Sequence, residues 1–101
     1  MRQEPRIRFL TIDMDCTNLR RNLDENLQTI LSSIHKEFTS KEFIDVYHRT
    51  SPNSYAEGVR GFGDFRRLHA WIARWYLLEK VKAGILRLQT NPHDDKKWRR
   101  V

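Results

Sequence analysis

The sequence predicts a mostly helical α+β domain in which three helices precede a C-terminal β-hairpin. Apolar residues recur at helical spacing through much of residues 17–82. Capping residues stand where the expected helices begin, and two short alternating segments flank a cluster of turn formers near the end of the chain. The length of 101 residues supports one domain with a modest core.

The first 16 residues are expected to form a short strand or an extended arm. Residues 6–12 mix β-branched and aromatic side chains, which favours extended structure. Thr17 then offers an N-cap for a helix over about residues 18–37, because its hydroxyl can accept from a free backbone amide. The chain is thus divided into an arm, residues 1–16, and a domain, residues 17–101.

Apolar stripes and a capping box predict the first two helices. Thr39 and Glu42 have the capping-box spacing, in which each side chain bonds the backbone amide of the other residue. The second helix should end near Thr50, because the next residue precedes Pro52 and is biased away from helical angles. The inward residues are Leu19, Leu23, Leu27, Ile30, Leu31, Ile34 and Phe38 on the first helix, and Phe43, Ile44, Val46 and Tyr47 on the second.

Residues 51–63 are expected to form a loop, because they hold one proline and three glycines. Asp64 then caps a third helix that runs to about Lys82. Gly84 follows where a left-handed residue would end the helix. The inward side of the third helix is predicted to consist of Phe65, Leu68, Trp71, Ile72, Trp75, Leu78 and Val81.

Two strands, residues 85–89 and 96–101, are predicted around the turn formers of residues 90–95. Their inward side chains should be Leu86, Leu88 and Trp98. Three helices followed by this hairpin resemble the winged helix-turn-helix superfamily over about residues 18–101. The resemblance rests on the order of elements, above all on LLEKVKAGILRLQ, where the third helix passes through a glycine into a strand. The connection between the second and third helices is longer than in a tight helix-turn-helix.

The resemblance implies that the third helix enters the major groove of DNA, while the hairpin, or wing, contacts the neighbouring backbone or minor groove. Charge points the same way. Residues 1–48 hold seven Lys/Arg and eight Asp/Glu, whereas residues 49–101 hold twelve and five, so the net charges are −1 and +7. Such asymmetry is typical of a polyanion binder, because each neutralised phosphate releases counterions. A basic surface kept for solubility is the alternative.

The candidate nucleic-acid-binding residues are the basic side chains that the predicted loop, third helix and hairpin would expose in residues 49–101. Arginine suits the task because its planar guanidinium pairs with guanine edges or holds phosphate. The candidates are Arg60 in the loop, Arg66, Arg67, His69 and Arg74 on the third helix, and Arg87, Lys96, Lys97, Arg99 and Arg100 on the wing.

We therefore expect a small intracellular DNA-binding protein of the cytoplasm, nucleoid or nucleus, acting as a transcriptional or replication accessory factor without a cofactor or metal. Its partner would be duplex DNA, and a homodimer would match palindromic half-sites. The alternative is a winged-helix module for protein contact or ribonucleoprotein assembly, with RNA or a protein complex as partner. No apolar run suffices to span a membrane, and the lone Cys16 favours a reducing compartment.

One motif indicates catalysis instead. Asp13 and Asp15 follow an apolar run and resemble the first motif of haloacid-dehalogenase-type phosphatases, where they would act as nucleophile and acid/base and help to hold magnesium. That fold needs several parallel strands, whereas residues 17–82 are predicted to be helical, and Cys16 stands where the family usually has glycine. The four histidines show no short pair at metal-ligand spacing. Neither an enzyme nor a metal site is expected.

Overall fold

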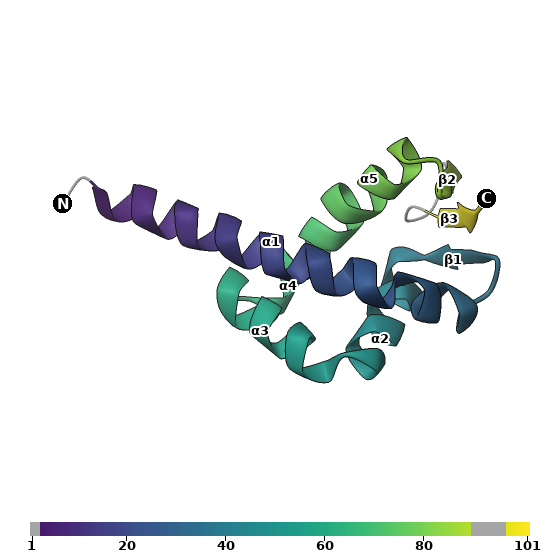
Figure 1. Ribbon diagram of the computed structural model, residues 1–101, viewed down its shortest axis with the longest axis horizontal. Helices are drawn as coiled ribbons and strands as arrows, with labels where there is room; N and C mark the ends of the chain where they lie inside the picture. Colours follow the sequence, from purple (N-terminus) through teal and green to yellow (C-terminus); the bar gives the residue numbers. More distant parts are fainter. Residues whose placement is uncertain (1–2, 90–96) are drawn as a thin grey trace.

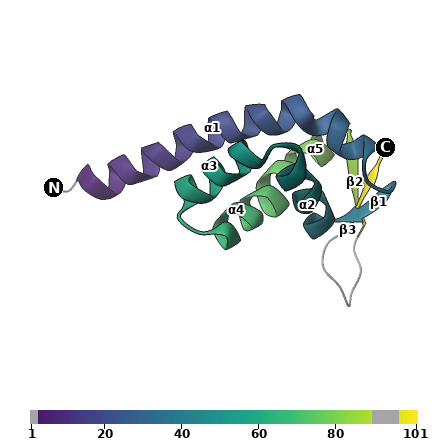
Figure 2. The same ribbon diagram turned by 90° about the horizontal axis from the view of Figure 1, so that it is seen from below.

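One long helix, α1, runs along one side of the molecule in Figure 2, and the other helices pack against its C-terminal half (Figures 1 and 2). The computed structural model describes residues 3–89 and 97–101, with side chains from residue 16. The elements are α1 (Gln3–Ser32), β1 (Glu37–Thr39), α2 (Ser40–Thr50), α3 (Pro52–Phe62), α4 (Phe65–Trp71), the π-helical turn η1 (Ile72–Tyr76), α5 (Leu77–Lys82), β2 (Leu86–Gln89) and β3 (Lys97–Arg100). The predicted α+β, mostly helical class is confirmed.

The strand or arm predicted at the N-terminus is wrong, because residues 3–16 belong to α1. No glycine interrupts this stretch, and Pro5 falls in the first turn, where a helix tolerates proline. The β-branched residues lower helix propensity only by tenths of a kcal/mol each, and extending an existing helix avoids the cost of a new nucleus. Thr17 therefore lies inside α1 and is not its N-cap.

The capping signals at Thr39 and Asp64 and the second helix are confirmed. The Thr39 Oγ1 atom accepts from the Glu42 amide at 3.1 Å, and Glu42 Oε1 accepts from the Thr39 amide at 2.8 Å. The Asp64 carboxylate accepts from the Arg66 amide at 2.8 Å and caps α4. All four apolar residues predicted to face inward on α2 are buried.

The loop predicted over residues 51–63 is wrong, because α3 occupies most of it. Pro52 stands in the first turn, where its fixed φ suits a helix. Gly58 is buried where α3 meets α1 and α4: a Cβ there would lie 3.1 Å from Leu68 Cδ1 and 3.5 Å from Leu19 Cδ1. Gly63 ends the helix with a φ of 83°. The glycines thus permit close helix packing and a left-handed cap.

Replacing Gly58 with leucine is expected to destabilise the fold by about 1–3 kcal/mol, because the larger side chain would overpack the contact with Leu68. The matched control is Ala56→Leu, which places the same side chain at an exposed position of α3. Urea denaturation followed by circular dichroism gives both free energies of unfolding. Equal midpoints for the two variants would contradict the close packing of α3.

The last helix is continuous from Phe65 to Lys82 but contains the π turn η1. A π turn holds an additional residue, so every later position is rotated relative to an α-helix. Leu68 and Ile72 are buried as predicted, and Tyr76 then takes the inward position in place of Trp75.

The structure therefore corrects two predicted core residues. Trp75 is 70% exposed, because the π turn directs it outward, and Phe65 is 52% exposed at the first position of α4. Trp71, Leu78 and Val81 are partly buried against the core, which agrees with their predicted side of the helix.

The sheet is antiparallel in the order β1-β3-β2, so β3 is its central strand. The predicted pairing of the last two strands is confirmed. The assignment of Phe38 to the first helix is wrong, because α1 ends at Ser32 and Phe38 pairs with Trp98 in the sheet. Leu86 and Trp98 are buried and Leu88 is half-buried, as expected of the inner face.

Candidate nucleic-acid interface

A polar cluster fastens η1 and α5 to α1. The Tyr76 hydroxyl donates to Asp24 Oδ1 at 2.7 Å, and Lys80 Nζ lies 2.7 Å from the same oxygen. Burial raises the pKa of Tyr76, and its bond to Asp24 adds to the rise. Burial would also raise the pKa of Asp24, but the bonds from Lys80 and Tyr76 outweigh it and hold that pKa below 3.8. Arg20 pairs with Glu79 at 2.8 Å.

These contacts determine which charged side chains in the second half of the chain have an ion-pair partner. Glu79 pairs with Arg20 and Lys80, and Asp64 caps α4. From the last turn of α3 onward, six exposed cations form no ion pair with any side chain of residues 16–89 and 97–101. They are Arg60, Arg66, Arg67, Arg74, Lys82 and Arg87. We call these six residues the free cations.

The free cations follow the chain from the end of α3 to β2. Arg60 lies in the last turn of α3. Arg66 and Arg67 lie in the first turn of α4, which begins two residues after Gly63. Arg74 and Lys82 border one surface hollow, together with Trp75 and Leu78. The helical residues predicted as site candidates are thus exposed with the exception of His69.

The register of the sheet divides the predicted wing residues. Arg87 lies directly opposite Arg99, and Lys97 shares this outer face because side chains alternate along a strand. Arg100 has the same parity as Trp98 and belongs to the inner face. Arg99 is also engaged by Glu37, at 3.8 Å. Lys96 lies outside the described residues, and among the wing residues that are described only Arg87 is both exposed and without an ion pair.

His69 is part of an aromatic cluster between α2, α3 and α4. Its Nε2 atom lies 2.7 Å from the Tyr55 hydroxyl, and the His48 ring stacks on Tyr55 with centroids 3.9 Å apart. Burial lowers the pKa of His69, and the charge of His48 lowers it further, whereas Asp45 acts in the opposite direction. Half-buried and hydrogen-bonded, His69 is placed for packing.

The lowered pKa of His69 predicts a loss of stability in weak acid. Below the ordinary histidine pKa of about 6.5, the unfolded chain binds a proton more readily than the folded one. The free energy of unfolding should therefore fall between about pH 6.5 and the lower pKa of the folded state. His69→Gln should flatten this dependence in urea titrations between about pH 7.5 and 5, whereas exposed His35→Gln should not. Identical slopes for both variants would contradict the assignment.

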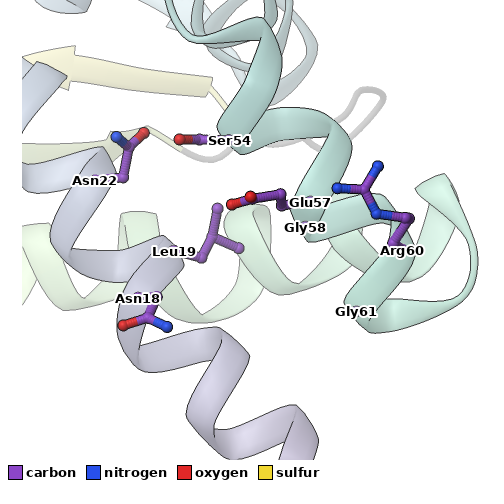
Figure 3. Close-up of a pocket in the computed structure, with 8 residues that line it drawn as sticks. All are labelled: Asn18, Leu19, Asn22, Ser54, Glu57, Gly58, Arg60 and Gly61. Carbon is purple, nitrogen blue, oxygen red and sulfur yellow. The ribbon is translucent and has the colours of Figure 1, made fainter.

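A groove of about 470 Å³ lies between α1 and α3 (Figure 3). Asn18 and Asn22 line its α1 side, and Ser54, Glu57 and Arg60 line its α3 side, with the Glu57 carboxylate pointing toward α1. Because a carboxylate and a guanidinium lie in the same groove, its charge is mixed. The groove is therefore a poorer match for a polyanion than the free cations that follow α3 in the chain.

The phosphatase motif lacks the strand that it requires. Asp13 and Asp15 lie within α1, so no strand exit presents them. Across the described part of the chain, no three His, Cys, Asp or Glu residues come together as a metal site. Nor does any described helix combine the length and apolar character of a membrane span.

Sequence reasoning missed two exposed residues of the last helix. Lys82 is exposed in the last turn of α5, and Trp75 is exposed beside Arg74. The outward position of Trp75 depends on the π turn, for which the sequence carried no recognisable signal, whereas Lys82 was detectable from its charge near the helix end. No family model, no curated protein and no solved structure matches the chain. The functional inference therefore rests on the charged and aromatic side chains that this chain exposes.

Proposed function

We propose that this chain binds nucleic acid, in the first place duplex DNA, through the free cations of α3, α4, η1, α5 and β2. The observation that carries the proposal is that this one stretch of the chain exposes six cations without an ion pair among the described residues. Leaving like charges together costs free energy through repulsion. A polyanionic backbone relieves that repulsion and gains counterion release.

The topology supports a winged-helix presentation of these residues. One strand follows α1, the helix from Phe65 to Lys82 leads directly into β2, and β3 returns between β2 and β1. In this arrangement α4, η1 and α5 form the DNA-facing helix, and β2 and β3 form the wing. The helix α3, which the winged-helix resemblance did not include, carries Arg60 in its last turn, shortly before α4 begins in the chain.

Different free cations have different tasks in the proposed complex. Arg66 and Arg67 lie in the first turn of α4, two and three residues after the Asp64 cap, and their guanidinium groups bind phosphate. Arg74, two turns further along, lies where a base edge or a phosphate can be reached. Arg87 extends the contact to the wing. Such a protein fits an accessory role in transcription or replication.

A salt titration of binding to a short labelled duplex tests the proposal. If the free cations contact about six phosphates, affinity should fall about a thousandfold between roughly 50 and 200 mM salt. Fluorescence anisotropy measures the dissociation constant at each concentration. No binding at low salt, or binding that salt leaves unchanged, would contradict nucleic-acid binding and favour the module for protein contact.

A further inference from the structure

Trp75 is an exposed tryptophan whose position is imposed by the fold. It is 70% exposed, although its neighbour Tyr76 is 1% exposed. The ring of Tyr76 is buried and its hydroxyl is bonded to Asp24 at 2.7 Å, so η1 cannot rotate to bury Trp75 without breaking that bond. π turns of this kind are frequent at functional sites.

The surroundings of Trp75 are cationic. It shares one hollow with Arg74, Leu78 and Lys82, and neither cation forms an ion pair with a side chain of residues 16–89 or 97–101. It also borders a second hollow, which includes Arg20. The acid common to both hollows, Glu79, is already paired with Arg20 and Lys80. An indole beside unpaired cations therefore remains available to a partner.

These charges disfavour a second copy of the chain as that partner. A two-fold contact centred on Trp75 would place Arg74 and Lys82 of one protomer near the same residues of the other. Like charges brought together at an interface cost several kcal/mol. A nucleic acid with an exposed base offers the complementary arrangement, an aromatic face linked to phosphates.

We propose that Trp75 stacks on an unpaired base while Arg74 and Lys82 bind the adjoining phosphates. The inference rests on the proposed function and narrows its ligand to nucleic acid in which a duplex adjoins a single-stranded segment. Arg60, Arg66, Arg67 and Arg87 contact phosphates of the duplex alone, whereas Arg74 and Lys82 contact phosphates where the duplex meets the unpaired strand, beside Trp75. Stacking tolerates any base, because every base has a π face.

The test compares a blunt duplex, the same duplex with a single-stranded tail, and a duplex whose tail keeps its phosphates but lacks bases. The wild-type protein is expected to bind the normal tail about 5- to 150-fold more tightly than the abasic tail. Trp75→Ala should abolish this difference and leave binding to the blunt duplex unchanged, whereas Trp75→Phe should keep most of it. Phe65→Ala, at the other exposed aromatic of the same helix, is the control.

Equal binding of normal and abasic tails by the wild-type protein would overturn the stacking. So would a preference that survives Trp75→Ala. If Trp75→Ala instead weakens all three duplexes and shifts a dimer to monomer in sedimentation, Trp75 belongs to a protein interface and the proposal is wrong. Binding of the blunt duplex distinguishes failure of the stacking from failure of the proposed function. If the proposed function is wrong, the wild-type protein binds none of the three nucleic acids.

Discussion

Replacing Arg66, Arg67, Arg74 and Arg87 with alanine is expected to weaken duplex binding by about a thousandfold at 0.1 M salt. Each phosphate that the variant no longer neutralises should remove about 0.9 from the slope of log K against log salt, or between three and four for the four residues together. All four side chains are exposed and form no ion pair in the described residues, so the fold should persist.

The matched control removes the same charge elsewhere. Arg21, Lys36, Lys41 and Arg49 are exposed on α1, α2 and the turn between α1 and β1. Their fourfold alanine variant has the same net charge but keeps the free cations. It should lose little affinity, and only through the longer-range field of the protein, which salt screens. If both variants lost binding equally, net charge and not a particular surface would govern the interaction.

Trp98→Ala is expected to destabilise the protein by about 3–5 kcal/mol, the range observed when a large core aromatic is truncated. Trp98 is 0% exposed on the central strand and pairs with Phe38 on one side and Leu88 on the other. Its Nε1 atom also donates to Ser40 Oγ at 2.8 Å, which ties the sheet to α2. Urea unfolding at neutral pH measures the change.

Two further variants separate packing from hydrogen bonding at Trp98. Ser40→Ala removes the acceptor of the indole and should cost about 1–3 kcal/mol, because it leaves a buried donor unpaired. Arg87→Ala, on the outer face of the neighbouring strand, should change stability by less than about 0.5 kcal/mol. A destabilisation below about 1 kcal/mol for Trp98→Ala would show that β3 is not held at the core.

The sequence predicted those parts of the fold that depend on local signals. The Thr39–Glu42 capping box, the Asp64 cap and the left-handed Gly84 each involve residues close together in the chain. The apolar stripe of α2 also has a local cause, since periodicity alone decides which side is inward. The β2–β3 pairing follows from its turn formers and alternation.

Three of the parts that failed depend on distant contacts. The three-residue strand β1 exists through its pairing with β3, about sixty residues later in the chain, and has no pattern of its own. In the sequence, Gly58 favours a loop. Only the structure shows that Leu19 and Leu68 pack against it. The π turn is linked to the bond between Tyr76 and Asp24, which the spacing of apolar residues does not reveal.

The candidate site shows the same difference between features with local signals and features that depend on distant contacts. Charge asymmetry located the free cations on α4 and η1, because exposed arginines form no part of the core. It could not anticipate that strand register places Arg100 on the inner face, or that Tyr55 binds His69. Trp75 was assigned to the core on helical spacing, and only the additional residue of η1 brings it to the surface.

Mapping of amide chemical shifts during titration with a short duplex tests the central claim most directly, and a chain of 12.2 kDa suits nuclear magnetic resonance. If the free cations form the interface, the largest shifts will cluster at the end of α3, along α4, η1 and α5, and at Arg87. Shifts concentrated on α2 and the C-terminal half of α1, with those segments unchanged, would contradict it.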